Sequence, residues 1–200
     1  MPVLGITGGV ATGKTTFTRA LLRRLPAELF DADRCAHELL ENDSAVRAAV
    51  SEAFGPEIYD AQGKPDRARL RELVFSEELH RRQLEEILHP AIRARWSALA
   101  EQVARTGGWL FVDIPLLYET GAESRFDRVI VVACSSETQR RRLRENRDLD
   151  DETASRIMAA QLDLKTKIKK ADHVIWNDST DACLDGQAAL LAGWLRQFYG

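Results

Sequence analysis

The chain has 200 residues, 44% of them hydrophobic, and its 28 basic and 31 acidic side chains give a formal net charge of −3. This length suits one compact core with one or two insertions, and the small acidic charge argues against a general nucleic-acid or membrane-surface binder. Cys35, Cys134 and Cys183 lie outside any C-x-x-C spacing and no run approaches the ~18 apolar residues of a membrane span, so we expect a cytoplasmic protein without a disulfide framework.

The first predicted strand, residues 3–7, leads into a phosphate-binding loop. Residues 8–15 read GGVATGKT and fit G-x-x-x-x-G-K-[ST] at every specified position. Phe17, Leu21 and Leu25 then recur at helical spacing. Strand, glycine loop and helix therefore follow in the order that the motif requires, whereas a glycine turn that happens to carry a lysine would not explain both flanking elements.

The residue types of this loop suit a triphosphate. Glycines at 8, 9 and 13 remove side chains that would block the approach of backbone N–H groups or forbid positive φ. Lys14 can reach the β- and γ-phosphates, Thr15 offers a hydroxyl to Mg²⁺, and the helix directs its positive dipole end at the anion. We predict that ATP contacts seven residues here: Gly9, Ala11, Thr12, Gly13, Lys14, Thr15 and Thr16.

Four further strands are predicted from short apolar or β-branched runs separated by helical patterns, at residues 28–30, 109–113, 128–134 and 173–177. This alternation predicts an α/β fold with a parallel sheet covered by helices. The mainly helical stretch from Arg34 to Thr106, broken by a polar turn at 60–65, exceeds one crossover helix. We interpret it as an inserted helical subdomain that shapes an acceptor pocket.

Asp31 and Asp33 follow the second strand. At the end of an extended segment, carboxylates two residues apart point to the same side, and parallel sheets bind ligands at that end. One of them could orient or deprotonate an acceptor hydroxyl. The alternative is that Asp33 caps a helix starting at Arg34.

Two other residues stand at the ends of predicted elements. Asp113 ends the third strand, where it could hold Mg²⁺ directly or through water, or simply bond local backbone before Pro115. His89 precedes Pro90, where one helical pattern, 84–88, gives way to another, 91–99. Backbone sterics alone explain a proline at a first helical position and a non-helical residue before it. Spacing therefore favours a structural role for His89.

The segment from Ser135 to Ala171 follows the fourth strand and is dense in arginine and lysine, with a helical composition at 153–160. In an acidic protein that carries a phosphate loop, such a segment is typical of a lid that closes on the nucleotide. The alternative is a solvated helix face whose charges are balanced by neighbouring carboxylates.

Together these residues resemble the dephospho-CoA kinase family over nearly the whole chain. The resemblance rests on an ordered set of segments: residues 5–16, 31–33, 88–90, 113–119 and 171–177. It implies a P-loop kinase that uses ATP and Mg²⁺ to phosphorylate the ribose 3′-hydroxyl of dephospho-CoA, the last step of coenzyme A biosynthesis. It implies no nucleic-acid or membrane partner and leaves the oligomeric state open.

The resemblance also implies a three-part organisation and a set of roles. The nucleotide-binding core would comprise residues 1–33, 107–136 and 171–200, the acceptor-binding insertion 34–106 and the lid 137–170. Asp33 would act as the base toward the ribose hydroxyl, with His89 and Asp113 also on the substrate side. Lys14 and a lid arginine would stabilise the transferring phosphoryl, and Asn177 would lie near the nucleotide base.

The chain departs from the family pattern in two places. Ala11-Thr12 replaces the usual Gly-Ser of the loop, and nucleotide binding should survive this change because the general motif does not fix position 11. Ungapped alignment from Thr138-Gln139 puts the first lid arginine on Arg142 and the second on Asn146, with Arg147 adjacent.

Two rival functions remain open from the sequence. Another small-molecule kinase could use the same core, because acceptor choice lies in the insertion. A GTP-controlled switch would use the D-x-x-G match at 60–63, but that match lies in a polar turn and no Asn-Lys-x-Asp motif occurs.

Overall fold

The structure is a computed structural model that describes residues 2–200, except for the side chains of Phe75 and Ser76. It divides into two compact units. The first contains the chain up to Phe30 together with Gln102–Gly200, and the second is Asp31–Glu101. The sheet and the phosphate loop belong to the first unit, and the predicted insertion, 34–106, overlaps the second.

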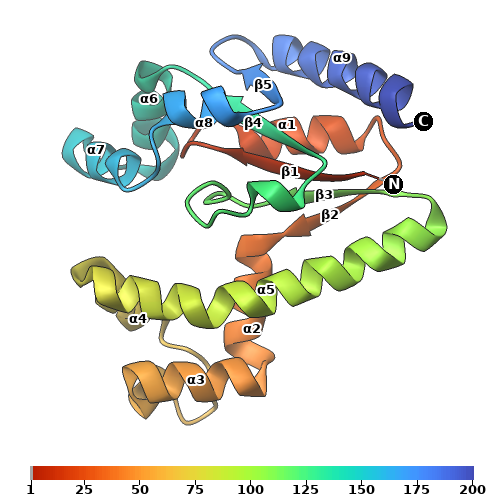
Figure 1. Cartoon of the computed structure of the whole chain (residues 1–200). Helices are drawn as coiled ribbons and strands as arrows, with labels where there is room; N and C mark the ends of the chain where they lie inside the picture. The colour runs from red at the N-terminus through yellow and green to blue at the C-terminus, as the bar shows by residue number, and fades with distance from the viewer. Residues whose placement is uncertain (1) are drawn as a thin grey trace. The chain divides into compact units, whose positions relative to one another are not determined.

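A five-stranded sheet with the order β2-β3-β1-β4-β5 forms the centre of the first unit (Figure 1). The pairs β1·β3, β1·β4 and β4·β5 are parallel, which confirms the predicted parallel sheet. Each predicted strand agrees with the observed one to within one residue at either end. The strands are β1 (Val3–Gly8), β2 (Ala27–Asp31), β3 (Trp109–Asp113), β4 (Arg128–Ala133) and β5 (His173–Trp176).

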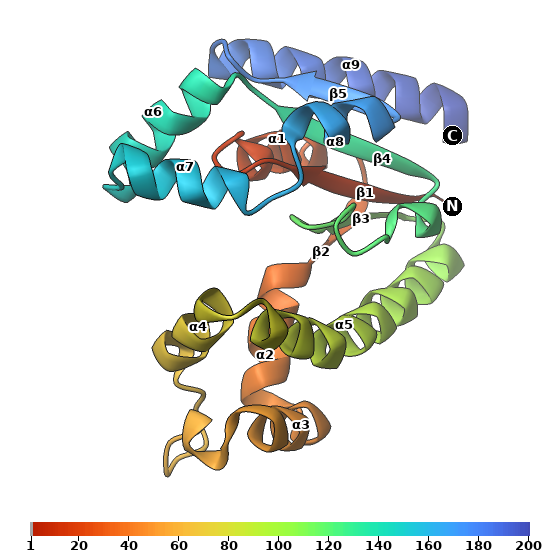
Figure 2. The ribbon, with the colours of Figure 1, turned by 60° about the vertical axis from the view of Figure 1, so that its left-hand side comes forward.

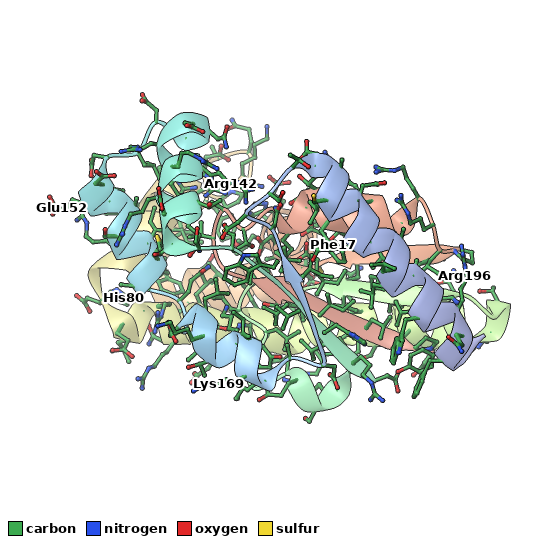
Figure 3. The ribbon with its side chains drawn as sticks, turned by 90° about the horizontal axis from the view of Figure 1, so that it is seen from above. Phe17, His80, Arg142, Glu152, Lys169 and Arg196 are labelled. Atoms are coloured by element: carbon green, nitrogen blue, oxygen red, sulfur yellow. The ribbon has the colours of Figure 1, made fainter. Side chains whose placement is uncertain are left out.

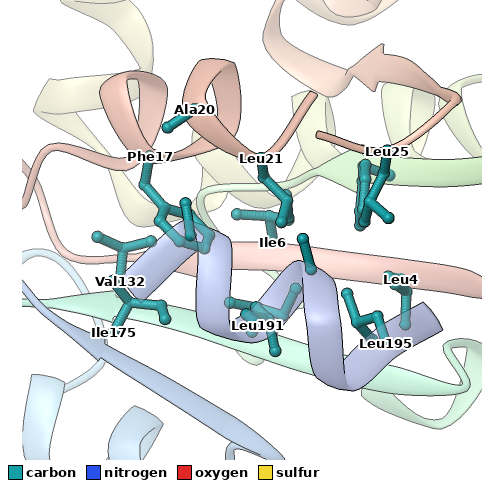
Figure 4. Packing of buried hydrophobic residues seen from close by; sticks show 14 of the residues in the cluster. Leu4, Ile6, Phe17, Ala20, Leu21, Leu25, Val132, Ile175, Leu191 and Leu195 are labelled. Atoms are coloured by element: carbon teal, nitrogen blue, oxygen red, sulfur yellow. The ribbon is translucent and has the colours of Figure 1, made fainter. Parts of the chain in front are cut away.

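Two helices, α1 (Lys14–Leu22) and α9 (Asp181–Tyr199), pack on one face of this sheet. Since successive side chains of a strand point to opposite faces, Ile130 and Val132 of β4 join the cluster with these helices. Figure 4 shows this packing between β1, β4, β5 and the two helices. Burial of this apolar stripe fixes α1, and therefore also its amino end, which directly follows the phosphate loop.

The opposite face of β4 carries Val129, Val131 and Ala133, which pack with Leu117, Tyr118 and residues of the segment before β5. That segment contains α6 (Ser136–Arg147), α7 (Asp151–Ala159) and α8 (Leu164–Lys170). Each helix is N-capped by the residue before it, Ser135, Asp150 or Asp163. Figure 2 shows these helices in succession, with α8 against β4. The predicted lid, 137–170, therefore lies within the first unit.

The second unit is helical: α2 (Ala32–Asn42), α3 (Ser44–Phe54), the short η1 (Pro56–Ile58), α4 (Arg67–Ser76) and most of α5 (Glu78–Thr106). The turn at 60–65 forms as predicted, because Asp60 Oδ1 accepts hydrogen bonds from the N–H groups of Gln62 (2.9 Å) and Lys64 (2.8 Å). The D-x-x-G match is therefore an aspartate-stabilised turn.

The expected break between two helices at His89-Pro90 is wrong. Helix α5 continues through Pro90, which lies in its interior, so His89 is helical. Proline removes one backbone donor but does not end a helix that is anchored on both sides. Leu88 and Trp96 are each 8% exposed, and their burial on either side of the proline holds the helix together.

Candidate active site

The phosphate loop joins the end of β1 to the start of α1. Gly13 is the N-cap of α1 in the left-handed region, with φ 89°, and Ala11 also has positive φ, 57°. Gly8 is needed for a different reason from the one expected, since a Cβ there would overlap the carbonyl oxygen of Val132 on β4. The loop therefore depends on glycine for close strand packing at Gly8 and for positive φ at Gly13.

Side chains from α6, from the segment between α7 and α8, and from the residue after β5 form hydrogen bonds with the loop. Gln139 Nε2 donates to the Val10 carbonyl (2.7 Å), and the Val10 N–H donates to Gln161 Oε1 (2.9 Å). Asn177 Nδ2 donates to the carbonyl of Thr12 (2.8 Å). These contacts satisfy two carbonyls and one N–H group of the loop, so side chains distant in sequence fix its backbone.

Arg142, the residue predicted as the first lid arginine, contacts this loop. Its Nη1 donates to the Ala11 carbonyl (3.3 Å) and its Nη2 to the Asn177 carbonyl (3.0 Å), so α6 is joined to both the loop and the end of β5 (Figure 3). It is half-buried, whereas four other arginines of α6 are exposed as a solvated face would require: Arg140, Arg141, Arg144 and Arg147. Asn146 is exposed as well.

Lys14 and Asp113 form an ion pair at the carboxyl ends of two neighbouring strands. Their side chains are 17% and 10% exposed, so the pair is largely shielded from water. Thr15 and Thr16 lie in the first turn of α1 and are exposed. The structure thus brings the predicted phosphate-binding lysine, the predicted metal-binding hydroxyl and Asp113 to one end of the sheet.

The donor set fits Mg²⁺, which needs only one or two protein oxygens when it also binds phosphates and water. Thr15 offers a hydroxyl and Asp113 a carboxylate at this end of the sheet. Within residues 2–200, no group of three or more His, Cys, Asp or Glu residues could hold a metal ion by itself. No helix in that part of the chain is long and apolar enough to cross a membrane.

Asp31, not Asp33, is the helix cap. Asp31 ends β2 and its Oδ1 accepts from the Arg34 N–H (2.9 Å), so α2 begins at Ala32 and not at Arg34. Asp33 lies exposed in the first turn of α2. The expectation that strand alternation turns both carboxylates to one side is therefore wrong, because Asp33 is already helical.

His89 is half-buried in α5 of the second unit. Burial lowers its pKa, the nearby Glu85 carboxylate opposes that change, and Arg93 adds to it. The lowered pKa favours the neutral imidazole, which can act as a hydrogen-bonding group.

Three residues of the site were not foreseen. Gln139 and Gln161 bind the loop, and Lys167 is completely buried in a contact with Glu119 Oε1 (2.8 Å). In the sequence Lys167 stands among the lysines at 165, 169 and 170, which are exposed. Lys167 differs from these lysines in lying on the buried side of α8, and that difference can be recognised only when the helix register is known.

Comparison with known proteins gives one consistent family. A sequence model described as Dephospho-CoA kinase matches residues 2–182. A dephospho-CoA kinase of Bacillus cereus is 39% identical over 179 residues, 89% of each chain. One from Methylococcus capsulatus is 38% identical and covers 96% of this chain and 95% of its own. The solved dephospho-CoA kinase from Campylobacter jejuni has a TM-score of 0.75 at 26% identity, covering 99% and 98% of the two chains.

Proposed function

The chain belongs to the dephospho-CoA kinase family, and we propose that Lys14, Asp33, Asp113 and Arg142 are the residues with which it carries out the family's reaction. That reaction is the ATP-dependent phosphorylation of the ribose 3′-hydroxyl of dephospho-CoA, which gives coenzyme A and ADP and completes coenzyme A biosynthesis. The observation that carries the assignment of residues is the phosphate loop with the Lys14–Asp113 pair beside it.

The phosphate loop would hold ATP through its backbone N–H groups and the amino end of α1. Lys14 then places a positive charge against the β- and γ-phosphates, where charge is redistributed as the phosphoryl group moves. Thr15 and Asp113 are the oxygens that would hold Mg²⁺. Bound there, the ion would neutralise charge on the phosphates of ATP.

Arg142 and Asn177 are proposed to serve the nucleotide. Both side chains bind the backbone of the loop, to the carbonyls of Ala11 and Thr12. A fixed loop presents its N–H groups without reorganisation during the reaction, which is how preorganised donors lower a barrier. Arg142 would also add positive charge near the transferring phosphoryl.

Asp33 is proposed as the general base toward the ribose hydroxyl, and its exposure in the first turn of α2 is compatible with contact to substrate. Capping does not explain the residue, because Asp31 caps α2. Residues 34–106, including His89, would bind the remainder of dephospho-CoA. His89 would act there as a neutral hydrogen-bonding group.

The discriminating experiment compares Asp33→Asn with Asp31→Asn. Loss of the basic oxygen should lower kcat of Asp33→Asn by roughly 10²–10⁴ with ATP affinity unchanged. Asparagine caps a helix about as well as aspartate, so Asp31→Asn should keep both activity and melting temperature. Full dephospho-CoA turnover by a folded Asp33→Asn protein would remove the assignment of the base.

A second measurement tests the acceptor. ADP release should depend on dephospho-CoA and stay at background with AMP, nucleosides or shikimate, since acceptor choice lies in the inserted pocket. Equal release with one of the other acceptors would favour a different small-molecule kinase.

We propose a cytoplasmic location for this enzyme. Cys35 and Cys134 are free and buried, and burial raises the pKa of both thiols, that of Cys134 to about 11. Such thiols are poorly reactive and suit a reducing compartment.

A further inference from the structure

The ammonium group of Lys167 is the buried charge that the proposed reaction does not use. Its side chain is 0% exposed, and Nζ donates to Glu119 Oε1 (2.8 Å) and to the carbonyl of Pro115 (3.0 Å). The Glu119 side chain is 21% exposed. Transfer of an ammonium group out of water costs several kcal/mol, so apolar residues of similar volume would often give equal or greater stability here. A contribution to folding stability therefore does not explain why this buried ion pair is present.

The Pro115 carbonyl oxygen links the segment after β3 to both α8 and β1. It accepts from Lys167 Nζ of α8 and from Thr7 Oγ1 of β1 (3.0 Å). One residue earlier, the Ile114 N–H donates to the Ile6 carbonyl (3.0 Å). Since Pro115 has no N–H, its carbonyl is the backbone group through which this residue can be held. Asp113 lies two residues away, at the end of β3.

The same region of the chain also holds the phosphate loop. Gln161 Oε1 accepts from the Val10 N–H (2.9 Å), and the N–H of the next residue, Leu162, donates to Glu119 Oε1 (2.9 Å). Residues 161–167 thus contact the loop that leads to Lys14 at one end and the segment after Asp113 at the other. This one stretch therefore contacts Val10, four residues before Lys14, and Pro115, two residues after Asp113.

We propose that Lys167 is a positioning residue for phosphoryl transfer, which fixes the end of β3 through the Pro115 carbonyl and so sets the position of Asp113 relative to Lys14. The inference rests on the proposed function of those two residues. Lys167 itself touches neither ATP nor dephospho-CoA. Its contribution is geometric, and misplacement of a catalytic group by about 1 Å can cost about 10²-fold in rate.

The test replaces the ion pair without leaving an unpaired buried charge. Lys167→Met keeps an unbranched side chain that is one atom shorter and carries no charge, and Glu119→Gln keeps the oxygen that accepts from Leu162. The double variant should keep its melting temperature and its ATP affinity while kcat with dephospho-CoA falls, by on the order of 10–10²-fold. If this variant does not fold, Lys167→Leu with Glu119→Gln is measured by the same criteria.

Lys170 and Glu123 provide the matched control. Lys170 lies on the same helix as Lys167 and pairs with Glu123 of the preceding segment (2.9 Å), but these side chains are 47% and 34% exposed. The donors to the Pro115 carbonyl are Thr7 and Lys167. Lys170→Met with Glu123→Gln should leave kcat unchanged. An equal fall in both double variants would mean that loss of any ion pair on α8 has this effect, and would overturn the proposal.

A mutant cycle with Asp113→Asn separates positioning from general stability. If Lys167 acts through Asp113, adding Lys167→Met/Glu119→Gln to Asp113→Asn should change kcat by no more than about twofold. Multiplied losses, or a folded double variant with wild-type kcat, overturn the inference. Wild-type turnover by Lys14→Ala and Asp113→Asn would instead refute the proposed function on which it rests.

Discussion

Substitution of Ala11 by glycine tests the conformation of the phosphate loop. Ala11 has φ 57°, in the left-handed region, which costs an L-residue about 1–2 kcal/mol. Glycine removes that cost but adds about 0.4–1 kcal/mol of conformational freedom to the unfolded chain. We therefore expect Ala11→Gly to raise the free energy of unfolding by between zero and about 1.6 kcal/mol, and in a chain of this size each kcal/mol raises Tm by about 2–4 °C.

The assay is thermal unfolding together with ATP binding. Ala98→Gly is the control with opposite sign, because Ala98 is exposed within α5, where glycine costs about 1 kcal/mol. ATP affinity of Ala11→Gly should stay near wild type, since the Ala11 group that binds Arg142 is the backbone carbonyl. A fall in Tm as large as that of Ala98→Gly would show that Ala11 is not strained.

Three further substitutions address the chemistry of the loop. Lys14→Ala should lower kcat by about 10²–10³ with the circular dichroism spectrum unchanged, and a folded variant with wild-type turnover would contradict the phosphate-loop mechanism. Thr15→Ala should shift the Mg²⁺ titration of kcat to higher concentration, and an unchanged titration would remove its metal role. Asn177→Ala leaves the Thr12 carbonyl without its amide donor, so it should lower the free energy of unfolding by about 1–3 kcal/mol and weaken ATP binding. Equal Tm and ATP affinity in calorimetry would show that this bond does not hold the loop.

The strands and the phosphate loop could be predicted from the sequence because their signals are local. Short β-branched runs such as 128–134 leave few alternatives to a buried strand, and the loop motif fixes residue types at fixed spacing. The turn at Asp60 was predictable for the same reason, since its hydrogen bonds join residues at most four apart.

The helix ends near the site could not be read in this way. Either Asp31 or Asp33 could be an N-cap by residue type, and which of them caps α2 depends on the residue at which β2 ends. Pro90 normally marks a boundary, but burial of Leu88 and Trp96 outweighs the hydrogen bond that proline removes. Local sequence pattern does not report that tertiary contribution.

The side chains that support the loop depend on contacts between distant parts of the chain. Gln139 and Gln161 both bind Val10, more than a hundred residues away in sequence. By residue pattern Arg142 resembles the exposed arginines around it, and the family resemblance alone distinguished it in the sequence. Roles that depend on such contacts need the structure, whereas the roles of Lys14 and Thr15 follow from the motif alone.

The position of the insertion between two neighbouring strands affects how easily the inserted segment can vary in length. The chain leaves the sheet after β2 and returns at β3, the strand next to it, so the inserted residues start and finish at adjacent points. Closing a flexible loop between fixed ends costs only about 0.6 kcal/mol more when its length doubles. The entropy of closing the chain between β2 and β3 therefore depends only weakly on the length of the inserted segment. If this segment binds the acceptor as proposed, new acceptor specificities can be engineered there while the phosphate loop after β1 is left untouched.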